Sequence, residues 1–240
     1  MKNLEEYLAQ RAAQKVRQDN ERLRRAGQGS KRLPLVDALD TSGSMNTDGK
    51  IGQAMEGREE IVRDLSGDRL TRNSCDMAEI TFSDTVRVAL PFTPVSEYPQ
   101  QRQPLTASGG THIGEAVFKA LELIDGQLAY YRQNQIPHYC PILWLMSDGN
   151  SWGEDSVILM RAIAETTTRI RSGQLKVYAI AIGSDADIAC LTALSGGCAP
   201  LQVGSHEIVK AMHEVSSSVI SASHDVEYLL NNAISRFTGK

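Results

Sequence analysis

The sequence predicts an α/β fold: a doubly wound, mainly parallel central sheet of about six strands flanked by helices, with an N-terminal helical extension. Two observations support this prediction. Short apolar runs of strand length alternate along the chain with longer segments of helical periodicity, which is typical of a parallel sheet covered by helices. Two of these runs are almost entirely apolar, Cys140–Met146 throughout and Leu175–Ile182 apart from Lys176, as expected of strands that are buried on both faces.

The N-terminal segment, residues 2–26, is rich in Glu, Gln, Ala, Arg and Leu, which favour a helix. Its apolar side chains recur at every fourth residue, at Leu4, Leu8, Ala12 and Val16. This stripe is too thin to bury much surface, and Gly27–Ser30 then ends the helix. We therefore expect a basic helical extension and linker at residues 1–32 and one domain at residues 33–240.

Strands and helices alternate from residue 33 onward. The expected strands are Leu33–Leu39, Met77–Phe82, Val86–Leu90, Cys140–Met146, Leu175–Ile182 and Leu201–Val203. The expected helices are Ile51–Leu65, Ile113–Ile124, Asp155–Arg171, Glu207–Ile220 and Val226–Phe237. Only Ser83-Asp84-Thr85 separates the second and third strands, which predicts a hairpin at a sheet edge.

Composition and charge narrow the class of protein. The 240 residues suffice for one large domain, and 41% hydrophobic with 22% charged residues argues against disorder. No apolar run approaches the ~20 residues of a membrane span, and the N-terminus lacks the apolar core of a secretory signal. Four cysteines without a C-x-x-C pair favour free thiols. We expect a cytoplasmic protein without a membrane partner.

Oxygen-bearing side chains gather where predicted strands end or a helix begins. Asp40, Ser42 and Ser44 follow the first strand at a spacing of two, which puts their side chains on one side of an extended turn. Thr111 follows two glycines and precedes a helix, and Asp148 follows the most apolar strand. Ligands in such folds bind at the carboxyl ends of the strands, so we expect these five side chains to meet.

Two carboxylates and three hydroxyls are the donors that hard cations prefer. Mg²⁺ takes about six oxygen ligands, so the set predicts bound Mg²⁺, or Mn²⁺, with a position left for an incoming oxygen. Three alternatives stay open. Asp48 or Ser44 could cap the following helix, Asp148-Gly149 could be a plain turn, or the site could have lost its metal.

The segments D-T-S-G-S-M, S-G-G-T and S-D-G resemble the metal-ion-dependent adhesion site (MIDAS) of von Willebrand factor type A domains, over roughly residues 33–221. The resemblance implies that Ser42, Ser44 and Thr111 contact the metal through their hydroxyls. Asp40 and Asp148 would then act largely through water. An ion with few anionic ligands stays electrophilic, so a partner protein would supply an Asp or Glu.

Within that superfamily, the sequence around these motifs looks most like that of bacterial TerY-type tellurite-resistance and stress proteins. The segments that carry this resemblance are R-L-P, L-T-A-S-G-G-T and P-I-L-W-L-M-S-D-G. This resemblance implies a scaffold in stress or phosphorylation signalling, beside a protein kinase and a PP2C-like phosphatase. Some TerY-like proteins carry a cysteine-rich metal module after this domain, and no such module follows in this sequence.

Two other function classes share features with this sequence. A Mg²⁺-dependent phosphatase of the haloacid-dehalogenase type needs D-x-D, but the residue two after Asp40 is Ser42, so we expect no enzyme. Nucleic-acid binding through the N-terminal extension is the other alternative. Nine basic against four acidic residues at 1–32 could touch phosphates. The net charge of −4 and the lack of aromatic residues there beyond Tyr7 disfavour it.

The sequence also suggests roles for three residues outside the predicted metal site. His112 and Trp152 follow the second and third segments and are candidates for a partner-binding rim, with packing or solvation as the alternative for each. Asp37 lies inside the first strand, where an apolar residue is expected. A buried unpaired carboxylate is costly, so we expect Asp37 to face a sheet edge or to pair with a cation.

Overall fold

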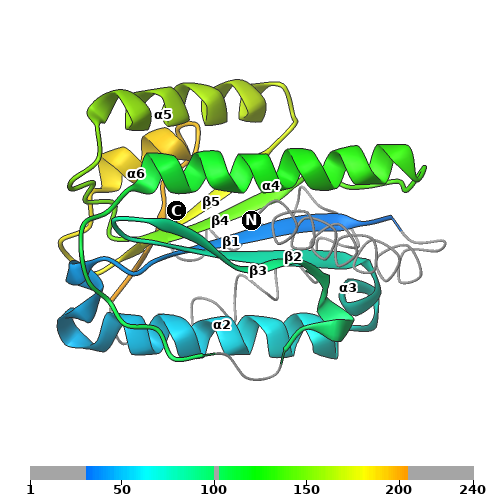
Figure 1. Ribbon diagram of the computed structural model, residues 1–240, viewed down its shortest axis with the longest axis horizontal. Helices are drawn as coiled ribbons and strands as arrows, with labels where there is room; N and C mark the ends of the chain where they lie inside the picture. Colours follow the sequence, from blue (N-terminus) through cyan, green and yellow to red (C-terminus); the bar gives the residue numbers. More distant parts are fainter. Residues whose placement is uncertain (1–30, 100–102, 205–240) are drawn as a thin grey trace, which may run out of the picture.

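A six-stranded sheet lies between two layers of helices in the computed structural model, which describes residues 31–99 and 103–204. The strands are β1 (Leu33–Asp40), β2 (Cys75–Phe82), β3 (Val86–Pro94), β4 (Ile142–Ser147), β5 (Lys176–Ile182) and β6 (Leu201–Val203). The helices are α2 (Lys50–Gly67), α3 (Arg69–Ser74), α4 (Ile113–Gln133), α5 (Ser156–Arg171) and α6 (Ile188–Leu194), with short 3₁₀ turns η1 (Gly43–Gly49) and η2 (Val95–Glu97). Helices α4, α5 and α6 cover one face, and α2 and α3 cover the other (Figure 1).

The strand order is β3-β2-β1-β4-β5-β6, and only β3 runs antiparallel to its neighbour. This confirms the predicted doubly wound, mainly parallel sheet, and the hairpin of β2 and β3 lies at a sheet edge as expected. The chain builds outward from β1 in one direction and then returns to β4, so the order reverses between β1 and β4. That reversal is where ligands bind in open α/β sheets.

The helices differ from the prediction in extent and number. Helix α4 continues to Gln133, nine residues beyond the expected end at Ile124. Helices α3 and α6 were not predicted, because six or seven residues are too few to show a helical period. Each begins at an aspartate whose side chain accepts a backbone N–H: Asp68 from Thr71 and Asp187 from Cys190.

The two ends of the chain leave some predictions untested. The helices expected at 2–26, 207–220 and 226–237 lie outside the described residues. The division between an extension and a domain at residue 33 stays a prediction. Arg32, at that boundary, is fully buried, and its guanidinium pairs with the Asp76 carboxylate on β2. Within the described residues, no helix has the length and apolar character needed to cross a bilayer.

The buried carboxylate in β1 pairs with a cation. Asp37 is 0% exposed, and the Arg58 Nε of α2 lies 2.5 Å from its Oδ2. Because β1 lies between β2 and β4, the alternative that Asp37 faces a sheet edge is wrong. Its register neighbour Trp144 on β4 is also fully buried.

Candidate metal centre

The candidate metal centre lies at the carboxyl ends of β1 and β4, at the reversal of strand order. Asp40 is the last residue of β1, and Asp148 directly follows β4. Both carboxylates are fully buried. The two strands pair directly, with Leu39 beside Met146, so the parallel sheet itself brings the two aspartates to the same edge.

Asp40 is held from both sides, by the first loop, which follows β1, and by Ser147 at the end of β4. Its Oδ1 accepts the backbone N–H of Ser42 at 2.7 Å, and its Oδ2 accepts the hydroxyl of Ser147 at 2.5 Å. Ser42 is buried and Ser44 is half-buried, and their hydroxyl oxygens lie 3.1 Å apart. Two hydroxyls at this separation can face one ion. The helix α2 begins after Gly49 without a side-chain cap, so the alternative of Asp48 or Ser44 as its cap is wrong.

The second loop, which contains the S-G-G-T segment, is hydrogen-bonded to the first loop through its backbone. Gly43 N–H donates to the Gly109 carbonyl at 3.0 Å, and Ser108 N–H donates to the Thr41 carbonyl at 2.9 Å. Gly109 has φ +80°, and a Cβ there would collide with the carboxylate of Asp84. The S-G-G-T spacing therefore lets the loop lie close against its neighbours.

Thr111 is held by the third loop, which follows β4 and contains Trp152. Its backbone N–H donates to the Trp152 carbonyl at 2.7 Å, and the two residues form an antiparallel bridge. A Cβ on Gly110 would lie 2.5 Å from the same carbonyl oxygen, so only glycine allows this approach. Thr111 itself is 3% exposed. The bridge brings the second and third loops together at the strand edge.

One oxygen of Asp148 has no hydrogen-bond partner within the described part of the chain. Its Oδ1 accepts the backbone N–H of Asn150 at 3.1 Å, whereas its buried Oδ2 accepts nothing. A buried unsatisfied carboxylate oxygen is costly. This orphaned atom, at the strand edge where Asp40 also lies, fits a divalent cation bound directly or through water.

The electrostatics of the centre also favour a cation. Burial raises the pKa of Asp40 from its ordinary 3.8 to about 6, although hydrogen bonds from Ser147 and Ser42 lower it. The nearby carboxylate of Asp148 raises the pKa of Asp40 further. In the described part of the chain neither aspartate has a lysine or arginine partner. The carboxylate of Asp40 is therefore destabilised by its burial and by Asp148, and a bound cation would offset this destabilisation.

The structure thus gathers Asp40, Ser42, Ser44, Thr111 and Asp148 at one edge. Their role as metal ligands stays a prediction. The described residues contain no group of three or more His, Cys, Asp or Glu side chains suited to a metal. A site here would therefore depend on serine and threonine hydroxyls, which suits a hard cation better than zinc.

The two rim candidates differ. Trp152 is 72% exposed and lies beside Thr111 through their backbone bridge. His112 is half-buried at the start of α4, where its Nδ1 lies 3.4 Å from Glu115 Oε2. Trp152 therefore offers far more surface to a partner, and His112 is engaged with its own helix.

Sequence reasoning gave no role to two residues that shape the centre. Ser147 binds Asp40 across the β1–β4 pair and also accepts the N–H of Gly149. Asp84, in the hairpin turn, accepts the N–H of Gly110 at 2.6 Å. The S of S-D-G was a visible signal for Ser147, but nothing in the sequence links Asp84 to the second loop.

Comparisons with known proteins agree with this architecture. A profile of the von Willebrand factor type A domain matches residues 35–216. The pilus adhesin SpaC of Lactobacillus rhamnosus GG superposes with a TM-score of 0.63 at 14% identity, covering 81% of this chain and 30% of SpaC. BatB of Bacteroides thetaiotaomicron gives 0.53 at 14% identity, covering 79% of this chain and 99% of BatB.

The mussel byssus protein called proximal thread matrix protein 1 superposes with a TM-score of 0.56 at 16% identity, covering 80% of this chain. A further structure of that mussel protein carries a zinc-occupied MIDAS motif. This chain spans 47% of the mussel protein's length, and identities this low show the fold alone. No curated protein sequence matches the chain. The profile match over most of the chain shows that it belongs to the von Willebrand factor type A domain family.

Proposed function

We propose that this chain is a metal-dependent protein-interaction module, which binds an acidic side chain of a partner through a divalent cation. The observation that carries the proposal is the pair of buried carboxylates, Asp40 and Asp148, at the strand edge with one orphaned oxygen. A bound cation would neutralise this pair. Because its other ligands are neutral hydroxyls, the cation would still attract a carboxylate from outside.

The five residues would have two different roles in holding the cation. Ser42, Ser44 and Thr111 would hold the cation through their hydroxyls, while Asp40 and Asp148 would supply the negative charge, largely through water. Ser147 keeps Asp40 oriented by its 2.5 Å hydrogen bond. The all-oxygen donor set favours Mg²⁺ or Mn²⁺. The zinc of the mussel protein's MIDAS makes Zn²⁺ a necessary comparison.

Trp152 would form the rim that contacts the partner's surface. Large aromatic side chains near the centre of an interface often supply much of the binding energy. The tryptophan is held next to Thr111 by backbone hydrogen bonding while most of its surface is exposed. We assign His112 a smaller share, because it is half-buried against its own helix.

A finer proposal concerns the biological setting. The amino-acid sequence around the motifs supports a TerY-like role as a scaffold in stress or tellurite resistance, with a protein kinase and a PP2C-like phosphatase as partners. We propose binding without catalysis, since Ser42 stands where a phosphatase of the D-x-D type needs its second carboxylate. The cytoplasmic location stays a prediction.

The test pairs metal titration with partner capture. Calorimetry with Mg²⁺, Mn²⁺ and Zn²⁺ on the full chain should detect binding that Thr111→Ala removes. Thr106→Ala is the matched control, because it is an exposed threonine of the same loop. Candidate kinase and phosphatase partners should then bind the wild type with metal and not Asp40→Ala. Unchanged metal affinity in Thr111→Ala would contradict the proposed centre.

A further inference from the structure

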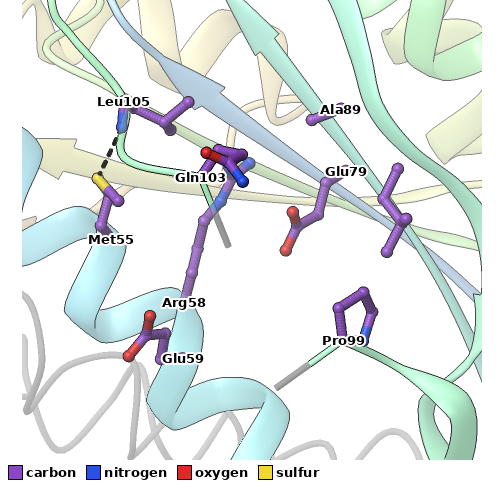
Figure 2. Close-up of a pocket in the computed structure, with 9 residues that line it drawn as sticks. Met55, Arg58, Glu59, Glu79, Ala89, Pro99, Gln103 and Leu105 are labelled. Atoms are coloured by element: carbon purple, nitrogen blue, oxygen red, sulfur yellow. Dashed lines mark hydrogen bonds between the residues drawn. The ribbon is translucent and has the colours of Figure 1, made fainter. Parts of the chain in front are cut away.

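A hollow lies on each side of the β2–β3 hairpin. Figure 2 shows the hollow toward α2, which has a volume of about 230 Å³ and is lined in part by Arg58. That guanidinium already pairs with Asp37 on β1. The hollow on the other side is a groove of about 570 Å³ between the hairpin turn, α4 and α5. This second hollow, the α4 groove, adjoins the candidate metal centre.

One end of the α4 groove is hydrogen-bonded to the loop that contains Thr111. Asp84, in the hairpin turn, lines the groove and accepts the N–H of Gly110 at 2.6 Å. The carbonyl of Ser83 accepts the N–H of His112 at 3.0 Å. Because these two bonds lie on either side of Thr111 in the chain, a ligand of the predicted cation comes within reach of the groove.

Helix α4 forms one wall and gives the groove its direction. Glu115, Phe118, Lys119 and Glu122 line it, at the spacings of three and four that place side chains on one side of a helix. The helix begins two residues after Thr111. At 1.5 Å of rise per residue, Phe118 lies roughly 7.5 Å along the axis from the start of the helix. The groove thus leads from the metal centre along α4.

The end of the groove beside the metal centre is acidic. Asp84 and Glu115 line it, and within residues 31–99 and 103–204 neither carboxylate has a lysine or arginine partner. Glu115 instead lies 3.4 Å from Nδ1 of His112, which is charged only when protonated. The Glu115 side chain is 42% exposed, so it can turn toward a ligand. This acidic end therefore attracts a cationic side chain.

An apolar part of the groove follows the acidic end. Half-buried side chains from three elements line it: Val86 of β3, Phe118 of α4 and Ile158 of α5. Arg161 covers the Phe118 ring, with its Cζ 5.9 Å from the ring centroid. The lysine and glutamate further along α4 pair with each other. An apolar side chain of a partner can therefore bury surface here without breaking an ion pair.

We propose that the α4 groove is a second contact surface for the partner of the metal centre and selects an extended segment with acidic, basic and apolar side chains in that order. The acidic residue binds the cation, a lysine or arginine lies at Asp84 and Glu115, and a leucine-sized side chain lies over Phe118. The inference rests on the proposed metal-dependent function.

The geometry of an extended strand sets the spacing of the motif. Alternate side chains share one face about 6.6 Å apart, so the pattern is Asp-x-Lys-x-Leu, read in one of the two chain directions. A wholly acidic segment is repelled at Asp84 and Glu115. The groove therefore distinguishes this partner from other acidic surfaces.

The probes are two capped peptides of opposite order, Gly-Asp-Gly-Lys-Gly-Leu-Gly and Gly-Leu-Gly-Lys-Gly-Asp-Gly. Each has two controls, in which Glu replaces Lys or Gly replaces Leu. All are titrated into the full ¹⁵N-labelled protein in saturating Mg²⁺, and the amide shifts of Val86 and Phe118 give the affinity. One order should bind about tenfold more tightly than each of its controls, as expected for one charge-assisted hydrogen bond or one partly buried leucine. If neither order exceeds its controls, the assignment is overturned.

Two pairs of variants locate the site. Glu115→Lys should remove the advantage of the Lys peptide over its Glu control, whereas Glu56→Lys makes the same charge change at an exposed position of α2 and should not. Ile158→Ser should lower the affinity to that of the leucine-free control. Val157→Ser, at the neighbouring position of α5, does not line the groove and should leave the affinity unchanged. An advantage that survives in Glu115→Lys would place the peptide elsewhere and refute the groove.

Metal dependence separates failure of the groove from failure of the metal centre. If the peptides bind only with Mg²⁺ but lysine and leucine add nothing, the groove is refuted and metal-dependent binding stands. If calorimetry detects no cation, both are refuted. Peptide affinity that a chelator leaves unchanged would overturn the joint contact.

Discussion

Replacing Asp40 by asparagine should change how stability depends on pH. In the absence of metal, burial raises the pKa of Asp40 to about 6, whereas its ordinary value is 3.8. The folded protein therefore holds this proton more tightly than the unfolded chain. Ionising Asp40 costs folding free energy, and the variant Asp40→Asn cannot ionise there.

The sign and size follow from proton linkage. Between pH 3.8 and 6 the folded state binds more protons at this group, so the group's contribution to stability is greatest below the lower value and falls as pH rises through 6. Ionising Asp40 completely lowers the free energy of unfolding by about 3 kcal/mol. The part of this loss that falls between about pH 5 and pH 7.5 is about 1.4 kcal/mol.

The assay is urea unfolding of both proteins in a chelator at several pH values. The free energy of unfolding of the wild type, minus that of Asp40→Asn, should fall by about 1.4 kcal/mol over this range. Saturating Mg²⁺ at pH 7.5 should then stabilise the wild type alone, by about 2.7 kcal/mol at a hundred times the Kd. A difference that stays flat or rises with pH would refute the reasoning.

Three further predictions concern other parts of the chain. Arg58→Met removes the guanidinium from buried Asp37, so the free energy of unfolding in urea should drop by about 3–5 kcal/mol; Arg58→Met with Asp37→Leu should recover most of it. Trp152→Ala should leave the melting temperature and Mg²⁺ affinity unchanged, because the ring is 72% exposed, while the affinity of a captured partner falls. A truncation starting at Ser30 should melt like the full chain and lose a partner contact; unfolding instead would move the domain boundary.

The sequence by itself was enough for the fold and for the prediction that Asp40 and Asp148 lie at one edge of the sheet. Strand-length apolar runs alternate with segments of helical period, so a strand was expected at each of the six places where the structure has one. Asp40 ends the first of these strands, and Asp148 directly follows the fourth. Because parallel strands end at one edge of a sheet, this position alone implies that the two carboxylates meet.

Interactions between distant segments were decided only by the tertiary structure. The hydroxyl of Ser147 reaches Asp40 across 107 positions of the chain, and Arg58 reaches Asp37 only because α2 packs on β1. The pairing of Glu79 with Leu90 depends on bulges in the hairpin. Local propensity and periodicity report on neighbours in the chain. Strand register and helix packing decide which distant charges meet, and these arise only when the whole core assembles.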